Sequence, residues 1–451
     1  MIKRTGALLL TIALTVGLAA CGGNNNDKAS PSASASDTPK ASASASTEPS
    51  TEPSAEPSAE PVKLRIYAQY ADDDTKLPYD YAVAELKKEM PNVELELDIQ
   101  AQDDGQKLKT YAATGNLPDI FQAGLDIINT FKQSGNILEL DQYAESTGFK
   151  AAVHPSAMNT LITDDGHIYA FPYAGNEMIL LFYNKELFEQ AGVQVPTNYD
   201  ELKAVVAAFK EKGIIPMSVF AKEKWPTVAL YDIFANHLDE GGVLKLDKGL
   251  AKASDPAYRT AAERLSEIIK LGLLPKGATS LNYDQAAALF YEGKAAMFLN
   301  GQWEIEASTE KLGDKVAWMY YPTADAANAE ASKVVFSGGG GPGGYAVSPQ
   351  TKDPELAAKV AAFISLKYAE FKYTQRGTPI VATKVDKPIE KPYPPMMEEL
   401  NKAIPTMKTT AFAWGLSNPR FKAAIEDASQ ALVAGSSVDQ FVKDVDKAIG
   451  Q

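Results

Sequence analysis

The chain has 451 residues and a net charge of −14. This length exceeds one typical hydrophobic core and predicts two domains of about 150–200 residues each. The acidic balance disfavours nucleic acid and anionic membrane surfaces as partners. The single cysteine, Cys21, excludes an internal disulfide framework and a cysteine-ligated metal site.

The first 20 residues have the pattern of an export signal. Lys3 and Arg4 precede a mostly apolar run over residues 7–20, which is shorter than the roughly 20 apolar residues that span a bilayer. The run ends Leu-Ala-Ala-Cys at Cys21, which resembles a bacterial lipobox. The resemblance implies cleavage before Cys21 and a diacylglyceryl group on its sulfur, which would anchor the protein at the extracytoplasmic face of the cell membrane. An uncleaved apolar anchor with an incidental cysteine is the alternative.

Residues 22–61 predict a disordered linker. They are nearly all Ser, Ala, Pro, Glu, Gly, Asn and Thr, with repeated SASAS, TEPS and AEPS units. Without large apolar side chains, such a segment cannot offset the entropy lost on ordering. We interpret residues 21–61 as the lipidated cysteine and a tether for the folded part.

The folded part begins near Val62 with a predicted βαβ unit. Residues 63–67 alternate like a strand, residues 81–90 carry a helical apolar stripe, and residues 92–99 alternate again. A strand, a helix and a strand in this order predict a parallel pair with a right-handed crossover.

Later segments continue the α/β pattern. Residues 179–183 form a continuous apolar strand, typical of a sheet buried on both faces. Helices are expected over residues 184–190, ending at Gly192, and between Asp255-Pro256 and Gly272, where the flanking residues suit helix caps. A further amphipathic helix is expected over residues 354–366. The predicted class is α/β with parallel-rich mixed sheets.

Four stretches carry a resemblance to a known family. They are LPDIFQAGLDIINTFKQSGNILEL (117–140), DGHIYAFP (165–172) with LFYNKELFEQAGVQVPTNYDEL (181–202), FYEGKAAMFLNGQWE (290–304) and GGGGPGGYAVSPQTKDPELAAKVAAFISL (338–366). Together they resemble the extracellular solute-binding proteins of ABC importers, the family that includes maltose-binding protein. The resemblance covers the chain from about residue 62 to residue 451.

The resemblance implies a type II periplasmic-binding-protein-like fold with two lobes. The first lobe would comprise residues 62–175 and 343–393, and the second residues 180–337 and 394–451. A carbohydrate would bind in the cleft between the lobes, whose closure presents it to the ABC permease subunits. Open α/β sheets also bind ligands at the carboxyl ends of their strands. The resemblance implies no cofactor, no metal and no catalytic residues.

Three tryptophans are candidate platforms for the apolar face of a sugar. Trp303 follows an Asn-Gly-Gln turn after a strand, and the family has a stacking tryptophan at this position. Trp414 lies between two helical stretches, and Trp225 is expected in the loop before a helix. Ordinary core packing is the alternative for each of them.

Polar candidates complete the predicted site. Asp126 and Glu177 match family positions whose carboxylates bind sugar hydroxyls, and charged acceptors make the stronger hydrogen bonds. Tyr67, Gln69 and Asp72 follow the first strand, where the first lobe usually contributes.

Two further features qualify this site. The family pattern has a tryptophan and an arginine where this chain has Ala123 and Ile127, which suggests a ligand other than maltose. Residues 338–344 lack the Gly-Lys-Ser/Thr of a phosphate loop, and we expect these glycines to let a crossing strand bend and approach the ligand.

Other functions remain as alternatives. A receptor for a polyamine, a peptide or a ferric complex is one alternative, and a polyamine site would use similar acids and aromatics. A glycoside hydrolase could use Asp126 and Glu177 as its two carboxylates, although no catalytic motif surrounds them. His154, His167 and His237 lack metal-ligand spacing, and each is expected to be exposed or structurally satisfied. A wall-attached adhesion protein would suit the tether alone. We expect a monomer that binds a carbohydrate and is not an enzyme.

Overall fold

The computed structural model describes residues 61–103 and 105–449. The expected signal peptide, Cys21 and nearly all of the expected tether lie outside these residues. Within the described ranges, none of the helices combines the length and the apolar run that a bilayer crossing demands.

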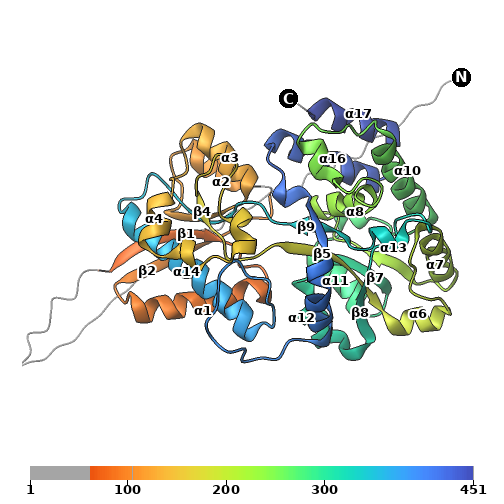
Figure 1. The fold of residues 1–451 in the computed structure, drawn as a ribbon, viewed down its shortest axis with the longest axis horizontal. Coiled ribbons are helices and arrows are strands. Elements are labelled where there is room, and N and C mark those ends of the chain that lie inside the picture. Colours follow the sequence, from red (N-terminus) through yellow and green to blue (C-terminus); the bar gives the residue numbers. More distant parts are fainter. Residues whose placement is uncertain (1–60, 104, 450–451) are drawn as a thin grey trace, which may run out of the picture. The chain divides into compact units, whose positions relative to one another are not determined.

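One sheet has five strands in the order β2-β1-β3-β10-β4, of which β1, β2 and β4 are labelled in Figure 1. The strands are β1 (Val62–Ala68), β2 (Val93–Ile99), β3 (Ile120–Ala123), β4 (Ala170–Phe171) and β10 (Gly344–Val347). β1 pairs in parallel with β2 and β3. The predicted βαβ unit at the start of the folded part is therefore confirmed.

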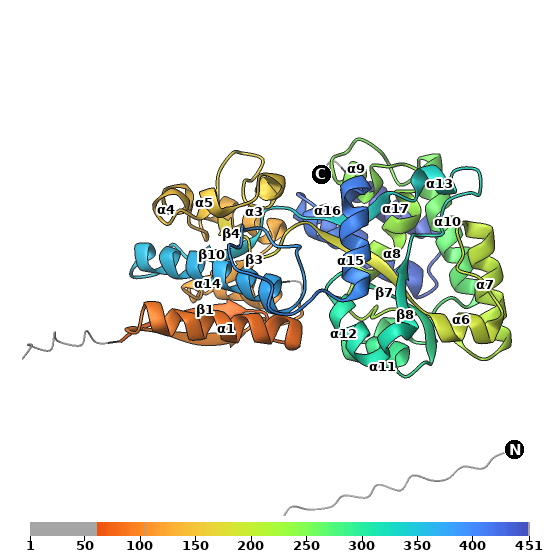
Figure 2. The ribbon, with the colours of Figure 1, turned by 60° about the horizontal axis from the view of Figure 1, so that its bottom comes forward.

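Side chains of this first sheet alternate between two buried layers, as the two-residue period of a strand requires. Leu64 and Ile66 pack into one core, whereas Tyr67 and Phe121 pack into the other. The helices associated with the first sheet are α1 (Asp73–Glu89), α2 (Gln106–Ala113), α3 (Leu125–Ser134), α4 (Asp141–Ser146), α5 (Phe149–Ala152) and α14 (Pro354–Gln375). α1 and α14 lie side by side (Figure 2).

The second sheet has the strand order β11-β9-β5-β7-β6, with β8 also paired to β5. Its strands are β5 (Glu177–Asn184), β6 (Ile215–Ser218), β7 (Ala295–Gly301), β8 (Val316–Met319), β9 (Val335–Gly339) and β11 (Lys408–Ala411). β5 runs antiparallel to β7, β8 and β9. β10 likewise runs antiparallel to both of its neighbours in the first sheet. These two strands make the share of antiparallel pairing larger than the sequence pattern predicts.

Most helices belong to the second sheet. They are α6 (Lys185–Ala191), α7 (Tyr199–Glu211), α8 (Trp225–Ala235), α9 (Gly242–Asp247), α10 (Pro256–Leu271), α11 (Tyr283–Tyr291), α12 (Glu304–Leu312), α13 (Ala329–Ser332), α15 (Pro395–Ala403), α16 (Pro419–Val433) and α17 (Val438–Ala448). All of them except α13 contribute to the large core of this sheet. Short 3-10 helices occur at Pro155–Thr160, Ala278–Ser280, Gly313–Lys315, Ile404–Thr406 and Ala413–Gly415.

Local capping signals predicted several helix ends correctly. The Asn184 side chain accepts hydrogen bonds from two backbone amides at the start of α6, and Gly192 ends this helix in the left-handed conformation. The helix between Asp255 and Gly272 is confirmed at both ends, with Gly272 at a φ of 100°. Glycine suits such a position because it has no Cβ to clash.

Two predicted helix boundaries are wrong. α1 begins at Asp73 rather than Tyr81, because Asp72 and Thr75 form a capping box and the helix accommodates Pro78 in its interior. α14 continues to Gln375, nine residues beyond the expected end at Leu366, because its later turns still bury Tyr368 and Ala369.

The chain passes between the two sheets three times, first from β4 to β5, then back from β9 to β10, and finally between α14 and α15. The two expected lobes and their boundaries stay a prediction. The return passage ends at Gly344, which has a φ of 127°. A Cβ on Gly344 would fall well inside van der Waals contact of the Phe171 carbonyl oxygen, so the first two passages meet backbone to backbone at the edge of the first sheet.

We expect Gly344→Ala to destabilise the fold by about 1–3 kcal/mol more than Gly435→Ala, because overpacking adds to the strain of a positive φ. Gly435 is a matched control, since it has a φ of 102° but open space where a Cβ would lie. Thermal and urea unfolding of both variants measure the difference. Equal losses of stability would contradict the close backbone contact.

Candidate functional site

A pocket of about 770 Å³ lies among the passages between the sheets and the adjoining strand and helix ends. This volume falls in the range of about 300–1,000 Å³ that small-molecule sites occupy. The residues expected to hold the ligand all line it, namely Tyr67, Gln69, Asp72, Asp126, Glu177, Trp225, Trp303 and Trp414. Gly339–Gly341, Gly343 and Gly344 line it as well. That these residues contact a ligand stays a prediction.

Three half-buried tryptophans form one wall of the pocket. The ring centroid of Trp414 lies 4.6 Å from that of Trp225 and 5.4 Å from that of Trp303. Trp225 is the first residue of α8, not part of the loop before it, and Trp414 lies in the 3-10 helix Ala413–Gly415. Buried Phe412 packs behind Trp414 at 4.7 Å. The three rings therefore present a continuous apolar surface suited to stacking.

Trp303 is held by its immediate sequence neighbours. The Gln302 side chain accepts a hydrogen bond of 2.7 Å from the Met178 amide, and the Gln302 amide donates to the Met178 carbonyl at 3.0 Å. A Cβ on Gly301 would collide with the six-membered ring of Trp303. Glycine at 301 therefore leaves the space that the Trp303 ring occupies.

A buried carboxylate fixes the helix that follows Trp303. Glu304, 1% exposed, accepts hydrogen bonds from the Tyr283 and Tyr291 hydroxyls, the Asn300 amide and the Ser308 hydroxyl. Burial raises the pKa of Glu304, while the hydroxyl donors oppose this shift. Because a buried carboxylate is costly unless it is hydrogen-bonded, these four donors lock the start of α12. Tyr283 also lines the pocket.

Glu177, the first residue of β5, faces the pocket from the passage between the sheets. Within the described part of the chain, no donor forms a hydrogen bond to its carboxylate. Burial raises the pKa of Glu177 to about 7, with Lys372 lowering it and Asp74 raising it further. Glu177 is therefore a poorly solvated acceptor that faces the pocket.

Unlike Glu177, Asp126 already has a cationic partner. It lies in the first turn of α3, and its Oδ2 is 3.1 Å from the Lys422 ammonium of α16. The Asn129 side chain, also on α3, donates a hydrogen bond of 2.8 Å to the Ser417 carbonyl just before α16. This bond and the ion pair connect the same two helices. A ligand at Asp126 would have to share its carboxylate with Lys422.

The remaining candidates from the first sheet have structural partners. Tyr67 lies within β1 rather than after it, and its hydroxyl accepts from the Ala101 amide at 3.0 Å. The Gln69 amide donates to the Gln122 side chain at 2.7 Å. Asp72 caps α1, which explains its position without a ligand.

Sequence reasoning missed several pocket residues. Glu223 accepts a hydrogen bond from the Trp225 side chain, and burial raises its pKa. Gln122 follows the Leu-Pro-Asp-Ile motif on β3, so its place at a strand end was a usable signal. Lys372 lies beyond the expected end of α14, and no local pattern connects it with its ion-pair partner Asp74.

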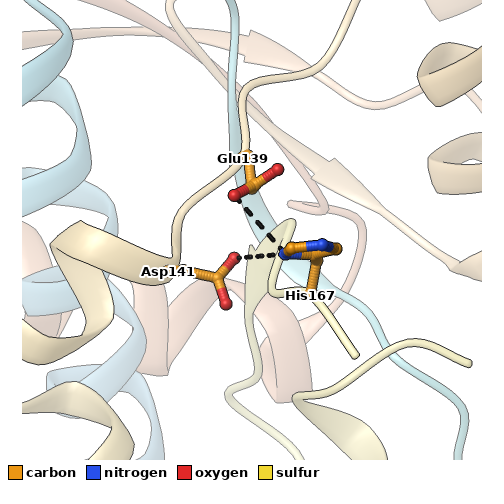
Figure 3. Close-up of side chains that lie close together, drawn as sticks. All are labelled: Glu139, Asp141 and His167. Carbon is orange, nitrogen blue, oxygen red and sulfur yellow. Dashed lines mark ion pairs between the residues drawn. The ribbon is translucent and has the colours of Figure 1, made fainter. Parts of the chain in front are cut away.

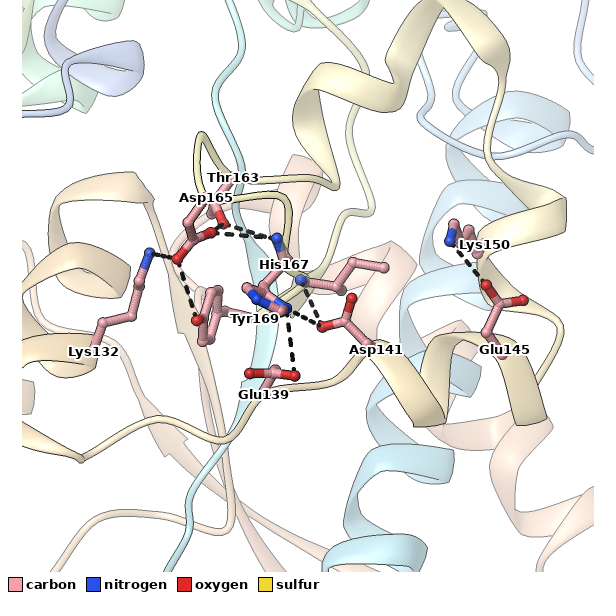
Figure 4. Close-up of polar contacts among 10 residues, drawn as sticks. Lys132, Glu139, Asp141, Glu145, Lys150, Thr163, Asp165, His167 and Tyr169 are labelled. Carbon is pink, nitrogen blue, oxygen red and sulfur yellow. Dashed lines mark hydrogen bonds and ion pairs between the residues drawn. The ribbon is translucent and has the colours of Figure 1, made fainter.

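Three side chains outside the pocket could hold a metal ion. Glu139 Oε1 and Asp141 Oδ2 each lie 3.4 Å from His167 Nδ1 (Figure 3). Carboxylate and imidazole are both zinc ligands. Asp141 Oδ2 also accepts from the Ile168 amide at 3.1 Å, and Asp165 bonds Lys132 and Thr163 nearby (Figure 4). The cluster is largely exposed, and pairing of the imidazole with the two carboxylates also accounts for it.

The sequence of residues 72–367 matches the family described as bacterial extracellular solute-binding protein. The chain belongs to this family. Among curated relatives, an uncharacterized ABC transporter extracellular-binding protein of Pyrococcus horikoshii is 25% identical over 252 residues, covering 53% of this chain and 56% of the relative. A probable sugar-binding periplasmic protein of Brucella suis is 28% identical over 223 residues, covering 48% and 51%. The chain thus spans about half the length of these two relatives.

Solved structures confirm the predicted fold of this solute-binding protein. A chitin oligosaccharide binding protein matches with a TM-score of 0.73 and 23% identity, covering 85% of this chain and 97% of that chain. At this level of identity the match establishes the two-lobed α/β architecture alone.

We expect Glu177→Gln to stabilise the protein at pH 8 by up to about 3 kcal/mol and to change little at pH 4. The carboxyl has a raised pKa of about 7 in the folded state, so the folded protein binds the extra proton between roughly pH 4.5 and 7. Stability therefore falls as the pH rises through this window, and the glutamine removes the loss.

Thermal unfolding midpoints at pH 4 and pH 8 measure this effect. Glu189→Gln, at an exposed position on α6, serves as the control. Its effect on the unfolding midpoint should be the same at both pH values. If Glu177→Gln changed the unfolding midpoint equally at both pH values, as the control should, burial would not destabilise the Glu177 carboxylate.

Proposed function

We propose that this protein is the carbohydrate receptor of an ABC importer, which binds a sugar in the pocket and delivers it to permease subunits. The observation that carries the proposal is the wall of Trp225, Trp303 and Trp414 in the same pocket as the unpartnered carboxylate of Glu177. The curated relative described as probably sugar-binding and the chitin oligosaccharide binding protein support this class of ligand.

The pocket chemistry suits a sugar on two counts. Sugar rings have apolar C–H faces that stack on aromatic side chains, and their hydroxyls donate to charged acceptors with strong hydrogen bonds. Glu177 offers its carboxylate to such donors, while Gln69, Gln122 and Tyr173 add neutral polar groups to the lining. A polyamine would also use these acids and would make cation–π contacts with the tryptophans, so it enters the binding test below as the competing ligand.

We further propose that bound sugar is released intact. Glycoside hydrolysis needs two carboxylates that act as acid and as base or nucleophile. Asp126 is the expected partner of Glu177 for this chemistry, but its carboxylate is in an ion pair with Lys422. The family and its structural neighbours are binding proteins, which favours a receptor.

The expected lobes, anchor and assembly complete the proposal. Residues 62–175 with 343–393 and residues 180–337 with 394–451 would close around the ligand by hinge motion. Lipidation of Cys21 and the tether over residues 22–61 would keep the receptor, as a monomer, near the permease on the outer face of the membrane. The family name agrees with an extracellular location.

We expect Trp303→Ala to weaken carbohydrate binding at least tenfold, because the variant loses the stacking surface. The wild type is first screened by thermal shift and then titrated by calorimetry with xylo-, chito-, malto- and galacto-oligosaccharides and their monosaccharides. Trp318→Phe is the control, since Trp318 lies on β8 and not in the pocket. A sugar that binds one-to-one and is recovered intact supports the proposal.

Two outcomes would contradict it in different ways. Binding of spermidine or a short peptide in place of every sugar would keep the fold and reject the carbohydrate ligand. Cleavage of a bound sugar would reject the receptor and direct mutagenesis to Asp126 and Glu177.

We expect Cys21→Ser to abolish palmitate labelling of the protein in its bacterial host and to move it from the membrane to the soluble fraction. Trp318→Phe again provides a control with unchanged labelling. A Cys21→Ser protein that stays in the membrane fraction would show that an uncleaved apolar segment anchors it instead.

A further inference from the structure

Charged side chains in the pocket lining are strongly unbalanced. Eight carboxylates and four lysines line the pocket, and no arginine does so within the described residues. A concave surface lined by one sign of charge focuses its field on whatever enters. The charged groups that lack counterions therefore determine which ligand charges the pocket favours.

The lysines do little to offset this excess. Lys372 forms an ion pair with Asp74, and Lys422 lies 3.1 Å from Asp126. Lys224 lies 2.8 Å from Asp427 on α16. Lys222, the fourth lysine, is exposed to solvent, where water screens its charge. The three half-buried ammonium groups thus already have anionic partners.

Four half-buried carboxylates of the lining lack a cationic partner among the described residues. Two of them, Asp72 and Asp103, each accept a hydrogen bond from a backbone amide of their own segment. Glu177 and Glu223 form no ion pair with the described part of the chain, and protein surrounds both of them. Burial raises the pKa of each carboxyl, which reflects the cost of a charge in this environment. A second anion placed beside them would increase that cost, whereas a hydroxyl or an ammonium group would reduce it.

We propose that this pocket accepts neutral and amino sugars and rejects acidic sugars, with Glu177 and Glu223 as the residues that enforce the distinction. The inference rests on the proposed function and narrows its substrate class. A uronate carboxylate can only accept hydrogen bonds and repels both glutamates, while sugar hydroxyls and an ammonium group donate to them.

Glu223 also connects this selection to the aromatic wall. Its carboxylate accepts from the side chain of Trp225, and it accepts a backbone hydrogen bond at Tyr283. A negative charge near Glu223 would therefore disturb the acceptor that orients one of the stacking rings. Glu177 lies at the passage between the sheets, where it pairs with Gly339.

The test compares matched ligands on the purified protein by calorimetry. The pairs are xylotriose with glucuronosyl-xylotriose, galactobiose with digalacturonate, and cellobiose with its glucosamine counterpart. For the pairs that bind, we expect the acidic member to bind at least thirtyfold more weakly than the neutral one. The glucosamine disaccharide should bind at least as tightly as cellobiose.

Isosteric variants identify the residues that select. Glu177→Gln and Glu223→Gln, made separately, should each reduce the neutral-to-acidic affinity ratio about tenfold, because each removes one repelling charge. A residue with a merely structural role would weaken both members equally and leave the ratio unchanged. Glu189→Gln, at an exposed position on α6, is the control and should leave the ratio at the wild-type value.

The possible failures are distinguishable. An acidic member that binds the wild type as tightly as its neutral partner overturns the inference and leaves the carbohydrate receptor in place. A ratio that neither glutamine variant alters overturns the assignment to Glu177 and Glu223. If no member of any pair and no sugar of the wider oligosaccharide panel binds the wild type, the proposed function fails, and the inference fails with it.

Discussion

The close packing of two backbone passages between the sheets organises the rest of this protein. Glu177 and Met178 pair with Gly339 and Gly338, and a Cβ on Gly338 would overlap the Glu177 carbonyl. Only glycine permits this approach, because any side chain would separate the strands. The same contact brings the Glu177 carboxylate and several glycine backbones to one pocket. The site therefore arises where the chain leaves one sheet for the other, rather than within either core.

The tryptophan wall is held in place by hydrogen bonds that lie behind the pocket surface. The carboxylate of Glu304 is almost fully buried and holds four donors, one of which is Tyr283 at the pocket surface. Gln302 bonds to both backbone groups of Met178, next to Glu177. The tryptophan wall and the acidic passage are thus linked through a few residues around position 302. A preorganised surface of this kind loses less entropy when a ligand binds.

Local chemistry determined which parts of the fold the sequence could predict. Pro256 and Gly272 predicted both ends of α10, because the effects of proline and glycine on the backbone are local, although the Asp255 side chain makes no capping hydrogen bond. The pocket candidates came from the family resemblance, and the structure places all of them in one pocket. The pairing of Asp126 with Lys422 and of Asp74 with Lys372 could not be predicted, since nearly 300 residues separate each pair. The cluster of Glu139, Asp141 and His167 could not be predicted for a related reason, because hydrogen bonds between Leu140 or Asp141 and Ile168 join two separate segments.

The ion pair between Asp126 and Lys422 gives the pocket an internal competitor. The Lys422 ammonium occupies an acceptor that an incoming hydroxyl would otherwise use, and both side chains are largely shielded from water. The affinity of any ligand that reaches Asp126 therefore depends on a difference in free energy. The Asp126 carboxylate pairs with Lys422 in one state and with the ligand in the other. Evolution can shift that difference through the length or charge of residue 422 while leaving every ligand contact of the tryptophan wall as it is.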